Sequence, residues 1–406
     1  MSTHTTHSTP TTHVLIVGAG FAGGMAAVRL AGRSRGRVAV TVVNPRPTFV
    51  NRLRLHQLAA GQQVPAPSIR RMLGPDVTFV EGYVTSLDPD GGRATVHGPD
   101  GVRQLLFDRA VLATGSTTEP VPVPGGEHTH GVADLAAAER LRHAVASLPA
   151  GADVAVVGGG FTGLETVGEL AATRPDVKTR LVTSGEVGGW FNPRAAAHVR
   201  TSLEGLGVES VGGARVRAVE PGLLLLDDGA EVPSDLTVWC GGFAAPPLAR
   251  ESGLAVDPAG AARTDAALQS VSHPQIMAVG DAGHTVAPHG GRYSMSCQLA
   301  FPSGAHAADV LSAEARGTAD GGPAPLDLGF QGRCVSIGSH AAVLQLTDRD
   351  DVAGDRALTG RTAVALKKFQ VRGVVAAIGI ARRAPGAIRW PGSGRAPSPV
   401  QAPVAG

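Results

Sequence analysis

The chain has 406 residues, of which 43% are apolar and 17% are charged, with a net charge of +2. This length exceeds one compact core, so we expect two or three globular domains. The three cysteines, Cys240, Cys297 and Cys334, lie far apart without a CxxC pair. This spacing argues against a disulfide framework or a metal site and fits a cytoplasmic protein. No apolar run reaches the ~20 residues that a membrane-spanning helix needs.

The charge is distributed unevenly along the chain. Residues 1–75 hold nine arginines and no acidic residue, so they carry +9 and the remainder carries −7. A basic half can indicate nucleic-acid binding, but this one lacks interleaved aromatic residues and contains a glycine-rich phosphate loop. We therefore expect an anionic cofactor and no nucleic-acid partner. Nearly all basic residues are arginines, which is typical of a bacterial genome of high GC content.

A strand–helix–strand unit occurs twice. Residues 14–17 form a short apolar strand, an alanine-rich helix follows, and residues 38–43 form a second strand. The same pattern returns over residues 154–183, about 140 residues later. The repeat predicts an α/β fold with two Rossmann-type, doubly wound, three-layer domains.

The first glycine loop, GAGFAG, stands between the first strand and its helix, the context that gives a GxGxxG pattern its meaning. Its glycines permit a tight turn, a close approach to a pyrophosphate and close helix packing, although such a motif can also be a purely structural turn. Asn44 stands where an acidic residue is expected, and it can still bind a ribose hydroxyl. The cofactor-binding candidates of this unit are Gly18, Gly20, Phe21, Ala22, Gly23 and Asn44.

The second glycine loop, GGGFTG, repeats the pattern at the second strand–helix junction. Its following strand ends in Val182-Thr183-Ser184, again without an acid. An acid there would repel a 2′-phosphate, so both NADH and NADPH remain possible. The candidates of this loop are Gly158, Gly160, Phe161, Thr162 and Gly163.

Two later segments end apolar strands in small residues. The first contains Ala113, Thr114 and Gly115, and the second contains Gly280 and Asp281. Either segment could be an ordinary turn. Their order after the first glycine loop fits an enzyme whose flavin extends from the first Rossmann domain towards a later part of the chain.

With these motifs, residues 13–380 resemble the two-dinucleotide-binding-domain flavoprotein superfamily, and within it the type II NADH dehydrogenase-like branch. The resemblance implies that the first loop binds FAD, the second binds NADH or NADPH, and Asp281 binds the FAD ribitol. Gly163-Leu164-Glu165 matches the Gly-Val-Glu of that branch, which places Glu165 near the nicotinamide and the flavin. The alternative for Glu165 is a carboxylate on the helix surface.

Residues 297–304 resemble the quinone-site pattern Ala-Gln-x-Ala-x-Gln-Gln-Gly of the same branch. Gln298 matches the first glutamine, whereas Pro302 and Ser303 replace the two later ones. The chain also lacks the amphipathic C-terminal helices that hold those dehydrogenases on a membrane, because Pro, Gly and Ser dominate after Ala384. Both departures argue against membrane quinone reduction.

The remaining site candidates lie around this segment and in the first domain. By the resemblance, Glu165, Cys297 and Gln298 are the catalytic candidates, and Cys297, Gln298 and Leu299 also adjoin the cofactor. A buried structural thiol is the alternative for Cys297.

Residues 45–65 contain no cysteine, which excludes disulfide-reductase chemistry of the kind found elsewhere in the superfamily. Arg52 or His56 in this region could contact the flavin or be solvated loop residues.

We therefore predict an FAD-dependent NAD(P)H oxidoreductase that passes electrons to a quinone or a small organic acceptor. Two alternatives stay open: a tailoring flavoenzyme of specialised metabolism, and a non-catalytic redox-sensing binding protein. The sequence leaves undecided the acceptor, the choice of nucleotide and whether the protein is a homodimer. The expected parts are residues 1–120 (FAD-binding, first part), 121–261 (NAD(P)H-binding), 262–322 (FAD-binding, second part), 323–383 (a small α+β domain) and 384–406 (a disordered tail).

Overall fold

The structure is a computed structural model that describes residues 11–287, 290–319 and 322–394. Its first domain is built on a five-stranded parallel sheet of order β18-β7-β1-β2-β3. Strand β18 comes from the later part of the chain, so two distant segments meet in one sheet. The strands are β18 (Ile276–Ala278), β7 (Arg109–Leu112), β1 (Thr12–Val17), β2 (Val38–Asn44) and β3 (Val77–Glu81).

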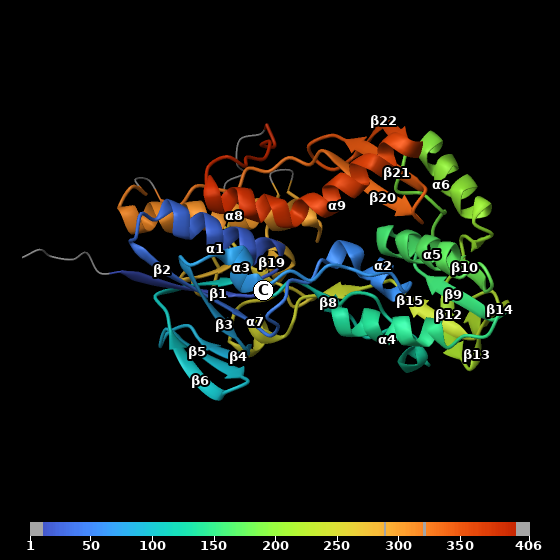
Figure 1. The fold of residues 1–406 in the computed structure, drawn as a ribbon, viewed down its shortest axis with the longest axis horizontal. Coiled ribbons are helices and arrows are strands. Elements are labelled where there is room, and N and C mark those ends of the chain that lie inside the picture. Colours follow the sequence, from blue (N-terminus) through green and yellow to red (C-terminus); the bar gives the residue numbers. More distant parts are fainter. Residues whose placement is uncertain (1–10, 288–289, 320–321, 395–406) are drawn as a thin grey trace, which may run out of the picture.

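The second domain contains a four-stranded parallel sheet of order β11-β10-β9-β15. In Figure 1 it lies to the right of the first domain. Two parallel sheets with flanking helices confirm the predicted α/β fold with two Rossmann-type domains. The strands are β11 (Glu209–Val211), β10 (Lys178–Val182), β9 (Asp153–Val157) and β15 (Leu236–Trp239).

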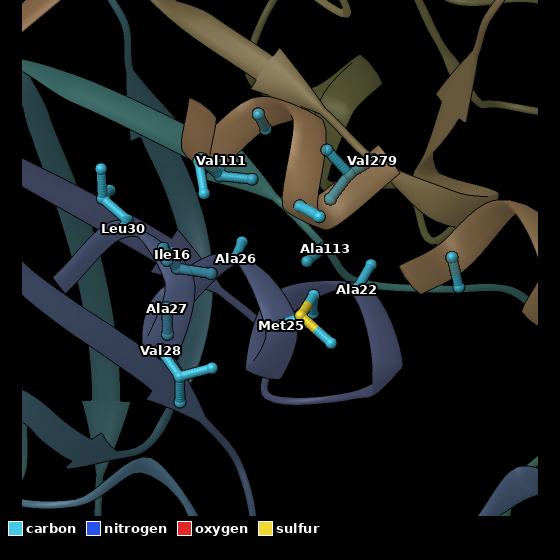
Figure 2. Packing of buried hydrophobic residues seen from close by; sticks show 14 of the residues in the cluster. Ile16, Ala22, Met25, Ala26, Ala27, Val28, Leu30, Val111, Ala113 and Val279 are labelled. Carbon is cyan, nitrogen blue, oxygen red and sulfur yellow. The ribbon is translucent and has the colours of Figure 1, made fainter. Parts of the chain in front are cut away.

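The core of the first domain follows from its continuous apolar strand. Residues 14–17 of β1 are all buried, because helices or loops cover both faces of a parallel sheet. Helix α1 (Phe21–Arg33) lies against this sheet and against helix α8 (Cys297–Arg316). Figure 2 shows Ile16, Met25 and Val279 among the small and aliphatic side chains of this core.

Shorter elements complete the two domains. One three-stranded antiparallel sheet contains β4 (Tyr83–Asp88), β5 (Arg93–Gly98) and β6 (Gly101–Leu106), and another contains β12 (Val216–Glu220), β13 (Gly222–Leu226) and β14 (Glu231–Ser234). Strand β8 (Thr117–Thr118) pairs antiparallel with β16 (Phe243–Ala244). Strand β17 (Ala262–Arg263) pairs in parallel with β19 (Gly283–His284). The remaining helices of these domains are α2 (Leu55–Ala59), α3 (Ile69–Leu73), α4 (Leu135–Ala146), α5 (Phe161–Thr173), α6 (Pro193–Gly205) and α7 (Leu248–Glu251), with 3-10 turns at Arg52–Arg54, Gly126–His128 and Gly280–Ala282.

The C-terminal part forms an antiparallel sheet followed by a long helix. The sheet contains β20 (Gly332–Ile337), β21 (Ala341–Thr347) and β22 (Ala353–Thr359), and helix α9 spans Gly360–Arg383. The sequence pattern of residues 325–382 predicts antiparallel strands followed by a helix around residues 363–369, and the observed helix is longer than that. In Figure 1, α9 runs from this sheet to the face of the first domain that holds α1.

Helix α9 is amphipathic, and its buried side packs on the C-terminal sheet and on the first domain. Its buried side chains recur at helical spacing, whereas Leu366, Phe369 and Ile380 on other faces are 40%, 77% and 50% exposed. Within the described ranges, no helix is both long enough and apolar enough to cross a membrane.

Residues 384–394, where we expected disorder, pack against the first domain. The Arg29 guanidinium donates to the carbonyls of Pro385 at 2.6 Å and Ile388 at 3.2 Å, and it also binds the Asp309 carboxylate of α8. Ile388 and Trp390 adjoin the core of that domain. Buried hydrogen bonds and apolar contacts hold this segment on the first domain despite its Pro- and Gly-rich composition. Residues 395–406 lie outside the described residues.

Candidate functional site

A cavity opens at the carboxyl ends of the first sheet, the edge where ligands bind in open α/β sheets. It is bounded by the ends of β1, β2 and β7 and by the turn after β18. The structure thus brings together most of the expected FAD residues. Those that line the cavity are Gly18, Gly20, Phe21, Ala22, Asn44, Arg52, Ala113, Thr114, Gly115 and Asp281.

The glycines of the first loop have conformations and close contacts that fit the motif. Gly18 has φ +103°, and a Cβ there would lie 2.4 Å from the Ala113 carbonyl oxygen. A Cβ on Gly23 would lie 1.9 Å from the Gly18 oxygen, so Gly23 packs beneath the loop instead of lining the cavity. Gly20 faces open space and begins α1 without a side-chain cap. The residues present therefore fit a pyrophosphate approaching a helix N-terminus.

Asn44 explains how the loop is held without an acidic residue. Its Oδ1 accepts a hydrogen bond from the Ala19 backbone N–H at 3.0 Å, and its Nδ2 donates to the Arg46 carbonyl at 2.8 Å. An aspartate could accept the first bond but could not donate the second. Asn44 therefore fixes the glycine loop while it also lines the cavity.

Asp281 is part of a polar set that also includes a residue we did not predict. Its carboxylate accepts from the Ser116 hydroxyl at 2.7 Å, and Arg52 donates to the Ser116 carbonyl at 2.7 Å and to its hydroxyl at 3.1 Å. Burial lowers the pKa of Arg52, and Asp281 opposes this shift. Ser116 directly follows Gly115, so its position after the small-residue turn was the available signal. Arg52 is a cavity residue and not a solvated one.

The second glycine loop repeats the geometry of the first. Gly158 has φ +120°, and a Cβ on Gly163 would lie 1.8 Å from the Gly158 oxygen. Gly160 faces open space at the start of α5. The ring of Phe161 packs edge-on against Phe191, with ring centroids 5.6 Å apart. The carbonyl of the next loop residue, Thr162, accepts a hydrogen bond from the Thr166 hydroxyl at 2.7 Å.

Glu165 is buried in an ion pair, so the helix-surface alternative is wrong. The residue is 7% exposed, and its Oε1 lies 2.7 Å from the Lys367 Nζ of α9. The same oxygen accepts from the Ser336 backbone N–H at 3.1 Å and from its hydroxyl at 3.3 Å. Burial alone would raise the pKa of Glu165, but Lys367, His56 and the Ser336 N–H together outweigh burial, so the pKa is lowered. Glu165 in turn keeps the pKa of Lys367 above its ordinary value despite burial.

Sequence reasoning missed Lys367, and it proposed His56 as either a flavin contact or a solvated loop residue. The sole signal for Lys367 was its rarity, because the chain has three lysines. His56 is 5% exposed, and its Nδ1 lies 3.6 Å from the Glu165 Oε2. His56 is therefore a buried helical residue beside Glu165 and not a solvated loop residue.

The start of α8, which departs from the quinone-site pattern in sequence, contributes little to the cavity. Cys297, Gln298 and Leu299 do not line the cavity, although Ala300 does. The Gln298 amide donates to the Gly332 carbonyl at 2.7 Å, and the Ser303 hydroxyl accepts from the Gly280 N–H at 2.9 Å.

Burial raises the pKa of the Cys297 thiol. Because a thiolate is the nucleophile, this shift favours the structural alternative for Cys297.

Comparison with known proteins matches residues 12–304 to the family model described as pyridine nucleotide-disulphide oxidoreductase. The chain belongs to this family. It is 32% identical over 321 residues to the NADH dehydrogenase-like protein MT1860 of Mycobacterium tuberculosis, covering 73% of this chain and 79% of that protein. It is 28% identical over 287 residues to the demethylphylloquinone reductase NdbB of Synechocystis, covering 66% and 71%.

The fold is shared with solved structures of low sequence identity. The structure of NDH2 from Plasmodium falciparum in complex with NADH superimposes with a TM-score of 0.76 at 15% identity, covering 92% of this chain and 99% of that chain. Family membership confirms an oxidoreductase that uses FAD and NAD(P)H, with the type II NADH dehydrogenase-like resemblance. Because residues 45–65 lack cysteines, the disulfide chemistry in the family's name has no counterpart in that segment.

Proposed function

We propose that the protein oxidises NADH or NADPH and passes the electrons, through bound FAD, to a quinone or a small organic acceptor. The observation that carries this proposal is the cavity at the first glycine loop, flanked by Asp281 and lying beside the domain with the second loop. The curated relatives, an NADH dehydrogenase-like protein and a quinone reductase, support the same reaction class.

In this proposal the protein's residues position the cofactors and stabilise charge. Residues of the first loop hold the FAD pyrophosphate at the start of α1, and Asp281 binds the ribitol. Residues of the second loop hold the nicotinamide nucleotide at the start of α5, the helix that also carries Glu165. Flavin chemistry supplies hydride acceptance and electron release, while the buried Glu165–Lys367 pair fixes the packing beside it.

The test is an anaerobic titration of the purified holoprotein with NADH and, separately, with NADPH, followed in the visible spectrum. We expect the flavin band to bleach with one equivalent of the preferred nucleotide. An acceptor screen with soluble quinones and dyes then follows. A bound flavin that neither nucleotide reduces would contradict the proposal, and an intact protein that binds no FAD would contradict the cofactor assignment.

One observation favours a second candidate, a tailoring flavoenzyme that acts on a soluble organic substrate. The two later glutamines of the quinone-site pattern are replaced by Pro302 and Ser303, and both are buried within α8. The Ser303 hydroxyl is engaged with backbone atoms of Leu299, Ala300 and Gly280, so it is not available to an acceptor. Turnover with soluble organic substrates but with no quinone would favour this candidate.

A further inference from the structure

A buried histidine stands beside the carboxylate of Glu165. His56 projects from α2, its Nδ1 lies 3.6 Å from the Glu165 Oε2, and its Nε2 is buried without a hydrogen-bond partner among the described residues. Buried polar atoms are almost always paired. An imidazole that has a carboxylate near one nitrogen and no hydrogen-bond partner on the other is suited to gain and lose a proton.

The Glu165 carboxylate divides its two oxygens between two partners. Oε1 binds the Lys367 ammonium at 2.7 Å, and Oε2 faces His56. The 3.6 Å separation exceeds a hydrogen bond, as is common at catalytic sites before the substrate binds. Lys367 also donates to the Cys334 carbonyl at 3.1 Å, which holds the ammonium in place.

The elements around His56 set its charge. Burial is the main cause that lowers the pKa of His56; Glu165 raises it, while Lys367 and Arg54 lower it. Helix α4, which also packs on α2, contributes Leu141 to the same apolar cluster. With Glu165 negative and Lys367 positive, the set is neutral when His56 is neutral. A negative charge that enters the neighbourhood would therefore favour protonation of His56.

Two observations link the buried set to the FAD cavity, although none of its three side chains lines that cavity. Arg52, about one helical turn before His56 along the chain, lines that cavity. The pKa of the Cys297 thiol is raised mainly by burial, and Lys367, Glu165 and Asp281 also influence it. Cys297 therefore lies within electrostatic range of both the buried pair and the cavity aspartate.

We propose that His56 takes up one solvent proton as the hydride is transferred and delivers that proton to the acceptor through Nε2. The inference rests on the proposed function. A hydride from NAD(P)H brings two electrons and one proton, so an acceptor that gains two electrons and two protons needs one further proton. A solvent proton forms the Nε2–H bond as the hydride's negative charge enters the site. That bond breaks as the acceptor's O–H bond forms, and His56 returns to its neutral form.

The first test measures proton uptake, which does not depend on turnover. The holoprotein is reduced anaerobically by NADH or NADPH in weakly buffered solution near pH 7 with phenol red as the indicator. We expect uptake of about one proton per flavin in the wild type and less than half of that in His56→Gln. His198→Gln is the matched control, because His198 on α6 also has a buried Nε2 without a partner among the described residues. Its uptake should equal that of the wild type.

The second test compares two acceptors in steady state. Reduction of 1,4-benzoquinone needs protons, whereas ferricyanide takes up electrons alone. His56→Gln should slow benzoquinone reduction by about tenfold or more and leave ferricyanide reduction within about twofold, at equal FAD content. If His56→Gln does not retain FAD, His56→Asn takes its place in both tests.

The outcomes separate this inference from the proposed function. Equal proton uptake in wild type and variant, or equal slowing with both acceptors, would overturn the role of His56 while NAD(P)H oxidation stands. A wild-type flavin that neither nucleotide reduces would overturn the proposed function and this inference together.

Discussion

Replacing Lys367 by methionine should strongly destabilise the protein, because it leaves the Glu165 carboxylate buried without its cation. Both side chains are 10% exposed, and their charged atoms lie 2.7 Å apart. With an effective dielectric constant of 20, the Coulomb attraction at this distance is about 6 kcal/mol. Desolvation of both ions offsets part of that gain, and removing one partner of a buried pair costs about 3–5 kcal/mol. We expect a loss of that size from Lys367→Met.

Glu165→Gln should lower the free energy of unfolding by a similar amount. The amide oxygen keeps the hydrogen bond from the Ser336 N–H, but the Lys367 ammonium is left without its carboxylate partner. The double variant removes both charges and should be no less stable than either single variant. Urea unfolding of all four proteins, followed by circular dichroism and tryptophan fluorescence, gives the coupling free energy. Asp88→Asn with Arg93→Gln is the control cycle, because that pair has the same kind of contact at 2.8 Å but is 44% and 52% exposed.

The control pair should show a coupling of less than about 1 kcal/mol. The pH dependence gives an independent check. The pKa of Glu165 is lowered from 4.5, so its contribution is present above that value and is lost as the pH falls. The pKa of Lys367 is raised from 10.5, so its contribution is present below that value and is lost as the pH rises further. A buried-pair coupling as small as that of the control would refute the reasoning.

Three further predictions concern Asp281, the second glycine loop and the Cys240 thiol. Asp281→Ala removes the acceptor of the Ser116 hydroxyl and should weaken FAD binding about ten- to hundredfold, measured as flavin retained after gel filtration; full retention would contradict it. Gly163→Ala places a Cβ 1.8 Å from the Gly158 oxygen and should abolish NAD(P)H binding in fluorescence titrations while FAD stays bound. The pKa of Cys240 is raised to about 12 by burial, so this thiol should react with Ellman's reagent at pH 8 far more slowly in the folded protein than in urea; equal rates would count against it.

Features that depend on residues close together in the chain, such as the two glycine loops, could be predicted from the sequence. Each glycine loop is a contiguous motif whose conformation follows from strand, turn and helix start, so Gly18 and Gly158 adopt the positive φ angles that the motif requires. The surroundings of Glu165 could not be predicted in this way. Its partner Lys367 lies about 200 residues later, on a helix whose apolar positions indicated only a short segment. Ser336 reaches the same carboxylate from a third segment.

Asn44 shows a different limit of sequence reasoning. The absence of an acid at the end of the second strand was visible, and a ribose contact was the natural interpretation. The structure shows that the amide bonds to Ala19 and to Arg46 within the protein. These bonds depend on the path of the chain after the strand, which residue types alone do not specify.

The packing of α9 and residues 384–394 on the first domain has a consequence for biosynthesis. Helix α1 is covered by Ile378 of α9 and by Pro385, which come much later in the chain. The first Rossmann unit therefore cannot reach its final packed state until α9 and Pro385 have been synthesised. A transcript truncated after α8 would yield a nascent chain with an uncovered apolar face, a substrate for chaperones and proteases.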